Sequence, residues 1–426
     1  MRCALTTLVA LLSGADAYVA APLARPLASH RPLPKSAIST AAPPLRAAPA
    51  TMVLGALPAA IMAPIAANRR IVGESHRLHY HRPRTSFLTR ALLLANCARA
   101  SAANRAGAVL AAAVVVLGWC LRVLNTPSRV YDRDKNTVGR EYDAWTSEGI
   151  LEYYWGEHIH LGSYGPKERK APFYGGKDFI EAKYDFIDRM LGFSETDAPA
   201  KVLDVGCGIG GTSRYIAKKF PSASVTGITI SPEQQRRATA LATERGVSNA
   251  KFELCDALDM KYEDNTFDLV WACESGEHMP DKVKYVEEMA RVLKPGGRIV
   301  IATWCQREEG DKAFTDKERA TLDYLYGEWT HPYFISIEEY ARIMERTGKL
   351  DKIVTDDWAE ETIPAWRHSI WVGVWDPWPV VRRPRLWWKV IRDAWCLDVM
   401  HRAFTDGLMQ YGMMTATKPV ASIAAP

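Results

Sequence analysis

The chain has 426 residues, 48% of them hydrophobic, which is enough for one large or two ordinary hydrophobic cores. Its formal net charge is +5, but residues 1–120 hold 13 basic and 2 acidic side chains, so the 41 basic and 47 acidic side chains that follow leave the rest of the chain mildly acidic. This balance excludes a nucleic-acid partner on electrostatic grounds, and eight cysteines without any C-x-x-C spacing favour structural thiols.

The N-terminal region has the composition of a targeting leader. Residues 1–17 contain Arg2, an apolar stretch and a closing Ala-Asp-Ala, the form of a cleavable signal peptide. Residues 18–105 carry twelve basic side chains against one acidic side chain among many Ala, Pro and Ser, which is typical of an unfolded transit peptide. The junction resembles the bipartite leader of algae whose plastids came from a eukaryotic endosymbiont, although Tyr18 stands where that motif has Phe. The resemblance implies a plastid of secondary origin, with the protein at its envelope or thylakoid membrane.

The next segment is uncharged. Residues 106–121 contain no Asp, Glu, Lys or Arg and lie between Arg105 and Arg122, a length at the short end of what spans a bilayer. We therefore consider two interpretations of residues 106–124: a membrane anchor, or the last hydrophobic part of the leader.

Residues 130–200 are predicted to form an N-terminal cap. Tyr, Trp and His are dense between Glu141 and Gly165, a composition that suits a lid over a ligand and the wall of an aromatic pocket. His158 is a candidate catalytic residue. Together with Glu157 and His160 it also offers metal ligands, but no further ligand follows at a typical spacing, so we expect no metal.

The segment Lys201–Gly211 predicts a strand, a tight glycine turn and the start of a helix. Such a turn allows a ligand to contact the backbone at a helix N-terminus. Its G-x-G-x-x-G spacing satisfies the dinucleotide fingerprint, but that fingerprint needs an acidic residue about 20 residues on. The next strand, Ser224–Ile230, ends in Thr-Ile-Ser instead. The D-x-G-x-G pattern that begins at Asp204 resembles motif I of the S-adenosylmethionine-dependent methyltransferases, which implies S-adenosyl-L-methionine rather than NAD.

That resemblance implies the cofactor contacts. The expected binding residues are Asp204, Gly206, Cys207, Gly208 and Gly210 in the turn, Thr229, Ile230 and Ser231 over the ribose, Asp256 and Ala257 at the adenine, and Glu274. Many methyltransferases have an acidic residue at the ribose position, and this chain does not. Which residues bind the ribose hydroxyls therefore stays open. The alternative role of Asp256 is to cap a loop rather than to bind adenine.

The segment Glu274–Asp281 follows a predicted strand, at the carboxyl end of the sheet where open α/β folds bind their ligands. A methyl transfer that needs a deprotonated acceptor requires a general base close to the acceptor group. Glu274 and His278 are four residues apart, so on one helical turn the carboxylate would orient the imidazole as that base. The alternative is that Glu274 caps a helix and that His278 only packs in the protein interior.

The pattern of the remaining chain predicts an α/β fold. Strands and helices alternate through residues 201–305, which indicates a mainly parallel sheet with helices on both faces. In residues 306–418, an insert of about fifty residues separates the last two predicted strands and holds half of the 14 tryptophans. This insert is either a membrane-interface surface or a second hydrophobic lobe. We expect a class I (Rossmann-like) methyltransferase sheet with an N-terminal aromatic cap and a Trp-rich C-terminal insert.

Two stretches resemble the tocopherol-pathway methyltransferases. Residues 142–162 resemble the cyanobacterial-type 2-methyl-6-phytylbenzoquinol enzymes, and residues 274–282 resemble γ-tocopherol methyltransferase. The spacing of Glu274 and His278 is also similar to plant N-methyltransferases related to the latter. The resemblance covers residues 130–418 and implies methylation of a ring carbon of a prenylated quinol or a tocopherol at a membrane. The alternatives are a sterol or small-amine methyltransferase, and a non-catalytic membrane-anchored binding protein.

Overall fold

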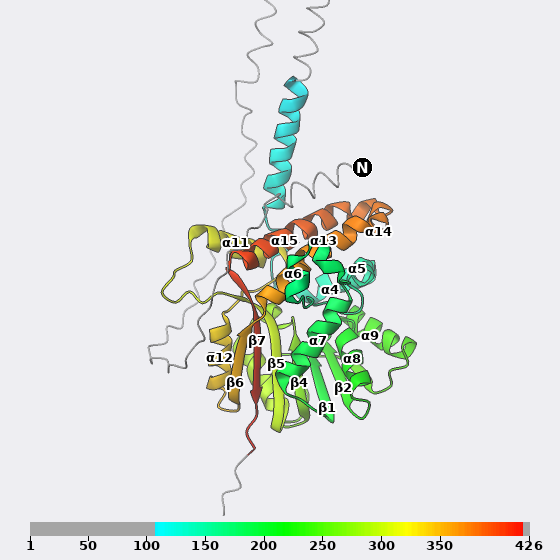
Figure 1. The fold of residues 1–426 in the computed structure, drawn as a ribbon, viewed down its shortest axis with the longest axis vertical. Helices are drawn as coiled ribbons and strands as arrows, with labels where there is room; N and C mark the ends of the chain where they lie inside the picture. The colour runs from blue at the N-terminus through cyan, green and yellow to red at the C-terminus, as the bar shows by residue number, and fades with distance from the viewer. Residues whose placement is uncertain (1–106, 421–426) are drawn as a thin grey trace, which may run out of the picture. The chain divides into compact units, whose positions relative to one another are not determined.

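The computed structural model describes residues 107–420 (Figure 1). The predicted signal peptide, the transit peptide and residue 106 lie outside the described residues. Of those described, residues 114–420 belong to one compact unit.

A seven-stranded sheet with the order β3-β2-β1-β4-β5-β7-β6 forms the centre of this unit. Strands β1 to β5 pair in parallel, and β7 is antiparallel both to β5 and to the edge strand β6. The strands are β1 (Lys201–Val205), β2 (Ser224–Thr229), β3 (Ala250–Leu254), β4 (Phe267–Cys273), β5 (Leu293–Gln306), β6 (Asp351–Asp357) and β7 (Met409–Thr417). The predicted alternation of strands and helices and the mainly parallel sheet are present, so the predicted fold class is confirmed.

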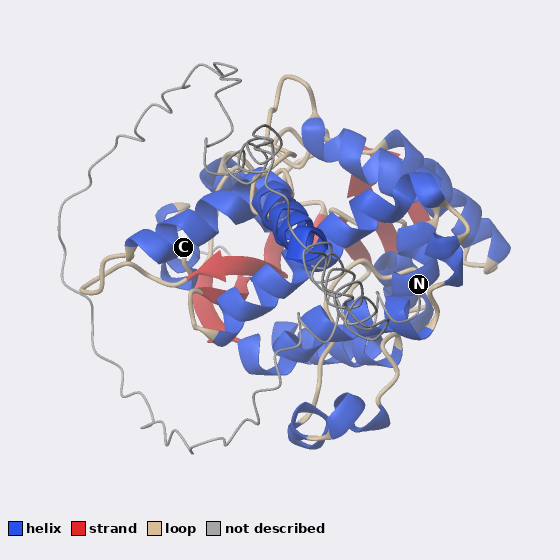
Figure 2. Cartoon of the chain, turned by 90° about the horizontal axis from the view of Figure 1, so that it is seen from above, coloured by secondary structure: helices blue, strands red, loops and turns tan. Residues whose placement is uncertain are grey.

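Side chains alternate between two cores because successive residues of a strand point to opposite faces. On β4, Leu269 and Trp271 pack into one core, whereas Val270 packs into the other. The helices that cover the sheet are α7 (Glu181–Ser194), α8 (Gly211–Lys219), α9 (Pro232–Glu244), α10 (Lys282–Val292), α11 (Asp316–Glu328) and α12 (Ile337–Arg346). Figure 2 shows helices on both sides of the sheet.

Short helices precede β1 in the region predicted as a cap. They are α4 (Thr137–Glu148), α5 (Ile150–Trp155), α6 (Pro166–Lys170) and the 3₁₀ turn η2 (Pro172–Gly176). Helix α4 packs against α9 and α5. The cap therefore lies beside the strand ends that carry the glycine turn.

The Trp-rich insert between β6 and β7 is helical: α13 (Ala359–Trp375), α14 (Trp378–Val381), η4 (Pro384–Leu386) and α15 (Trp387–Thr405). Helices α13 and α15 pack on each other, and Trp366 is fully buried against Trp304 of β5. Trp378 and Trp388, in contrast, remain exposed. The insert thus combines a packed lobe with an exposed aromatic surface.

Among the described residues, the helix Gly107–Leu124 is long and apolar enough to cross a membrane, with a mean hydropathy of 2.2. This assignment rests on the length and the composition of the helix alone, and a signal sequence passes the same test. Its last residue, Leu124, is buried in the compact unit.

Candidate active site

The glycine turn after β1 is required by close packing as well as by backbone conformation. Gly206 has φ +87°, and a Cβ there would lie 2.4 Å from Cβ of Ser275. A Cβ on Gly211 would lie 2.0 Å from the carbonyl oxygen of Glu157, in the cap. Gly208 differs, because its φ is +55° but a Cβ there would have no protein atom closer than 3.8 Å.

A cavity of about 320 Å³ lies over this turn, and we call it the polar cavity. Its lining includes Asp204, Gly206, Cys207, Gly208, Thr229, Ile230, Asp256, Ala257, Glu274, His158 and His278. Asp204 is buried, accepts a hydrogen bond from Ser213 Oγ, and has its pKa raised to about 6 by burial. Asp256 accepts a hydrogen bond from the backbone N–H of Leu258 at 2.9 Å, as the loop-cap alternative requires. Its side chain is nevertheless about half exposed at the cavity.

Two of the predicted cofactor residues do not line the polar cavity. A Cβ on Gly210 would meet the ring of Phe252 at 2.4 Å, so this glycine serves packing beneath the turn. Ser231 caps α9 by accepting from the N–H of Gln234, and it donates to Asp143 of the cap. Its hydroxyl is therefore engaged within the protein.

A second cavity, of about 340 Å³, is mostly apolar, and we call it the apolar cavity. It lies between the cap, the end of the helix Gly107–Leu124 and the insert. Its aromatic lining includes Trp145, Tyr154, Trp304, Trp329, Trp366, Trp387 and Trp395. Tyr142, Ile159, Glu274 and His278 line both cavities. We call these four residues the junction.

Glu274 is held rigidly at the junction. It follows β4 in a left-handed conformation, with φ +50°. Its Oε1 accepts hydrogen bonds from the N–H of Leu161, at 2.7 Å, and from the hydroxyl of Tyr411, at 2.6 Å. Burial raises the pKa of Glu274 to about 7, and the Leu161 and Tyr411 bonds limit this rise. The carboxyl group of Glu274 therefore binds a proton more readily than that of an exposed glutamate.

His278 lies at the same junction but does not bind Glu274, so the prediction of a carboxylate-oriented imidazole is wrong. Its Nε2 is 2.9 Å from the hydroxyl of Tyr142, and its ring stacks on His331 at 4.6 Å. Burial, reinforced by the charge of Lys282, lowers the pKa of His278 to about 3, whereas burial keeps the phenol of Tyr142 protonated. Tyr142 therefore donates to a neutral imidazole.

His158 lines the polar cavity and not the apolar one. Its Nδ1 is 3.4 Å from Thr212 Oγ1, and burial lowers its pKa well below the usual value. The fully buried Lys183 donates to the carbonyl oxygens of Trp155 and His158, at 2.6 and 2.7 Å, and so fixes this part of the cap. His158 is therefore placed beside the glycine turn, and it does not reach the apolar cavity.

Comparisons with known proteins decide between the ligand classes. A family model described as "Methyltransferase domain" matches residues 196–348. A 2-methyl-6-phytyl-1,4-hydroquinone methyltransferase of Synechocystis sp. is 42% identical over 304 residues, covering 68% of this chain and 91% of that protein. The chloroplastic tocopherol O-methyltransferase of Arabidopsis thaliana is 38% identical over 288 residues, covering 64% and 80%.

The chain belongs to the tocopherol-pathway methyltransferase family. It is therefore an S-adenosylmethionine-dependent methyltransferase, and the dinucleotide alternative is rejected. The [4+2]-cyclase SpnF shares the fold with a TM-score of 0.53, at 24% identity, covering 69% of this chain and 99% of that one. This likeness concerns the fold alone.

Sequence analysis missed several residues of the site of this methyltransferase. Tyr411 reaches Glu274 from β7, 137 positions further along the chain, and Tyr142 reaches His278 from the cap. Asp143 brings a carboxylate to the end of β2, where Ser231 and the N–H of Glu233 donate to it. The dense aromatic stretch of the cap was a signal for Tyr142, whereas no sequence signal marked Tyr411.

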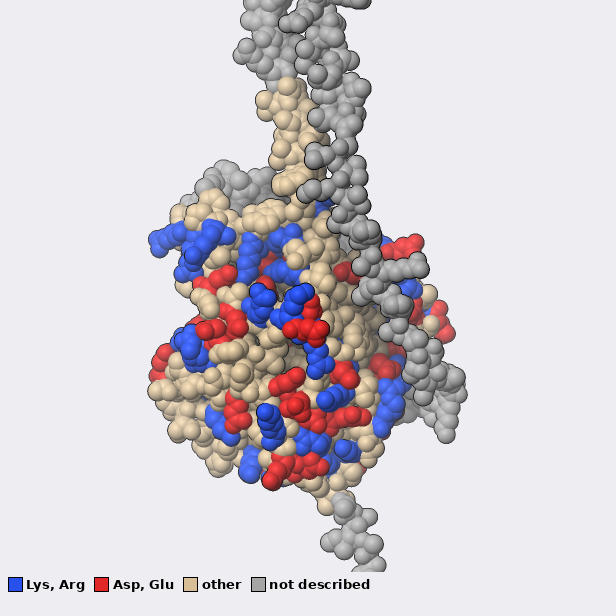
Figure 3. Space-filling model, turned by 180° about the vertical axis from the view of Figure 1, so that it is seen from behind, with Lys and Arg blue, Asp and Glu red and all other residues tan. Residues whose placement is uncertain are grey.

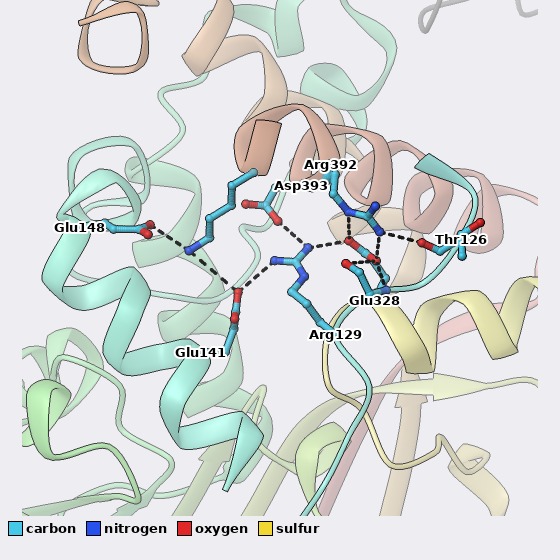
Figure 4. Close-up of polar contacts among 9 residues, drawn as sticks. Thr126, Arg129, Glu141, Glu148, Glu328, Arg392 and Asp393 are labelled. Carbon is cyan, nitrogen blue, oxygen red and sulfur yellow. Dashed lines mark hydrogen bonds and ion pairs between the residues drawn. The ribbon is translucent and has the colours of Figure 1, made fainter. Parts of the chain in front are cut away.

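An ion network ties the cap of the methyltransferase to the insert (Figure 4). Arg129 pairs with Glu141 of α4, Asp393 of α15 and Glu328 of α11, at 3.0, 2.7 and 3.0 Å. Arg392 binds the fully buried Glu328 and also the backbone carbonyls of Val123 and Thr126, at the end of the apolar helix. The network therefore fixes the walls of the apolar cavity to one another.

Proposed function

We propose that this methyltransferase transfers a methyl group from S-adenosylmethionine to a ring carbon of a prenylated quinol or a tocopherol. The observation that supports it most strongly is the arrangement of the two cavities. One is polar and lies over the glycine turn, the other is apolar and aromatic, and they meet at the junction that contains Glu274. The relatives named for prenylated substrates of this kind support the acceptor class.

The polar cavity fits the cofactor. Asp204, Gly206 and Gly208 would hold it over the turn, and Asp256 would accept from the adenine amino group. In place of the usual acid, Thr229 and Gln234 would face the ribose; these two side chains bond each other at 2.7 Å. Bound S-adenosylmethionine supplies the electrophilic methyl group.

Glu274 is the proton acceptor in this proposal, and its assignment as the base replaces the predicted role of His278. A base works best when its pKa lies near the working pH. The pKa of about 7 meets this condition, whereas that of His278, about 3, does not. Glu274 takes the proton of the acceptor hydroxyl, and the electron-rich ring carbon bonds to the methyl carbon as the methyl–sulfur bond breaks, with its electron pair staying on sulfur. The hydrogen on that ring carbon then leaves to water as a proton, and its electron pair restores the aromatic ring. His278 and Tyr142 form the polar wall beside it.

Acceptor choice tests the proposal. With labelled S-adenosylmethionine, we expect the purified protein to label a prenylated hydroquinol or γ-tocopherol at least 10-fold faster than a sterol or a small amine, because only the former places a phenol at the junction and a long apolar tail in the apolar cavity. Faster labelling of the sterol or the amine would contradict the proposed acceptor.

The glycine turn offers a test of the cofactor site. A Cβ at Gly208 has room in the protein but lies at the polar cavity, so Gly208→Ala should weaken S-adenosylmethionine binding at least 10-fold. Gly246→Ala is the matched control. Gly246 has a similar φ of +64°, no neighbour within 4 Å of a Cβ, and no place in the lining of either cavity. Equal loss in both variants, measured by calorimetry, would attribute the effect to backbone strain and sink the assignment.

We also propose that the protein works at a membrane of a plastid. A prenyl tail stays in the bilayer, so the ring must be reached from the surface. The apolar helix and the exposed tryptophans near Arg382, Arg383 and Arg385 support this location, as do relatives described as chloroplastic. Figure 3 shows acidic and basic side chains interspersed on one face of the molecule.

The exposed aromatic surface gives a further prediction. Trp388 is 43% exposed and does not line the apolar cavity, so Trp388→Glu should lower activity on a prenylated acceptor in vesicles several-fold more than activity on a short-chain soluble quinol. Val354→Glu, at an exposed apolar residue of β6 that lines neither cavity, is the control and should affect neither activity. An equal loss on both acceptors would favour a packing role for Trp388.

A further inference from the structure

Glu277 is a buried carboxyl group that the proposed reaction does not use. It lies in the 3₁₀ turn η3 (Gly276–His278), next to His278, and is 1% exposed. Its Oε2 accepts a hydrogen bond from Thr303 of β5 at 2.7 Å, whereas its Oε1 is buried without a partner. A buried oxygen without a hydrogen bond is unfavourable and calls for an explanation.

The other carboxylates around the apolar cavity are engaged. Glu141 and Asp393 pair with Arg129, and Glu148 pairs with Lys389 at 2.9 Å. Glu274 binds Leu161 and Tyr411. Glu277 therefore differs from the other described carboxylates of this lining, because one of its oxygens is buried without a hydrogen-bond partner.

The position of Glu277 relative to the junction indicates which part of an acceptor it meets. Glu274 and His278 line both cavities, but Glu277 lines only the apolar one. A ring whose reacting hydroxyl is at Glu274 would extend into the apolar cavity, which Glu277 lines. The far side of a 1,4-dioxygenated ring carries the second oxygen.

We propose that Glu277 binds the second ring oxygen of the acceptor and so selects 1,4-dioxygenated aromatic rings over simple phenols. This inference rests on the proposed function. Burial and the neighbouring Glu274 raise the pKa of Glu277 to about 8, so the group is mainly a neutral acid at pH 7. A neutral acid that accepts from Thr303 on one oxygen can donate from the other, which suits a hydroxyl or an ether oxygen in an apolar surrounding.

The test compares two acceptors with the same prenyl tail, a hydroquinol and the phenol that lacks its second oxygen. Wild-type protein should prefer the hydroquinol roughly 10- to 100-fold in kcat/KM, as expected when a site built for a polar group meets an analogue without it. Glu277→Met should bring this ratio close to 1, and Glu277→Gln should preserve most of it, because the amide retains a donor and an acceptor.

The ratio is independent of how much of a variant is folded. Thr303→Val, which removes the hydroxyl that positions Glu277, should lower the ratio in the same direction but less. An unchanged ratio in Glu277→Met, or a wild-type protein that uses both acceptors equally, would overturn the role of Glu277 and leave the proposed function intact. If the wild-type protein binds S-adenosylmethionine but methylates neither acceptor, the proposed function itself fails.

Discussion

Replacement of Glu274 by Gln is expected to lower kcat by roughly 10²- to 10⁴-fold, the usual loss when a general base is removed. The amide can still accept hydrogen bonds from Leu161 and Tyr411, so the junction should keep its shape while it loses the proton acceptor. Affinity for S-adenosylmethionine should change little. Glu253→Gln is the matched control, because Glu253 also accepts a 2.6 Å bond from a tyrosine hydroxyl, that of Tyr262, but lines neither cavity.

The pH dependence of kcat distinguishes Glu274 from His278. A base acts in its deprotonated form, so activity should rise with pH through about 7, the pKa of Glu274. Lys183, Tyr411, Tyr142, Glu277 and Cys273 are the ionisable groups that interact electrostatically with this carboxyl group. The rising limb should persist in His278→Ala and disappear in Glu274→Gln. A limb that disappears only with His278 would restore the imidazole as the base.

The ion network predicts a large effect on stability. Glu328→Ala should lower the free energy of unfolding by roughly 3–5 kcal/mol, because it leaves Arg129 and Arg392 without their shared buried partner. The control is Glu244→Ala, at a carboxylate that is 55% exposed and pairs with Arg237 on the surface. That change should cost less than about 1 kcal/mol.

Urea denaturation of the purified protein measures both variants. Equal small losses would show that the Glu328 network contributes no more than a surface pair. Because Arg392 also binds the carbonyls of Val123 and Thr126, Glu328→Ala should further increase hydrogen exchange of the amides that follow the apolar helix.

Local sequence patterns were sufficient for most of the fold and for the polar cavity. The strand-turn-helix at Lys201–Gly211 and the strand at Ser224–Ile230 depend on neighbouring residues, so they could be predicted from short windows. The insert was predicted only from its composition and from the strands on either side of it. These features specify neither the helices of the insert nor the apolar cavity that the helices line.

The interactions at the junction could not be predicted, for two physical reasons. The partners of Glu274 and His278 come from β7 and from the cap, so they depend on the topology of the whole sheet. The assumed i, i+4 geometry also requires an α-helix, but Glu274 has φ +50° and residues 276–278 form a 3₁₀ turn. The two side chains therefore do not form a hydrogen bond with each other. Burial gives Glu274, and not His278, the higher pKa.

The most direct test of the account is the position of a transferred methyl group. The purified protein would be given S-adenosylmethionine with a ¹³C-labelled methyl group and a prenylated hydroquinol, and the product examined by NMR. We expect the label on a ring carbon, with no labelled product from Glu274→Gln and normal labelling by Glu253→Gln. A label on the phenol oxygen, or an active Glu274→Gln, would contradict carbon methylation driven by a carboxylate base at the junction of the two cavities.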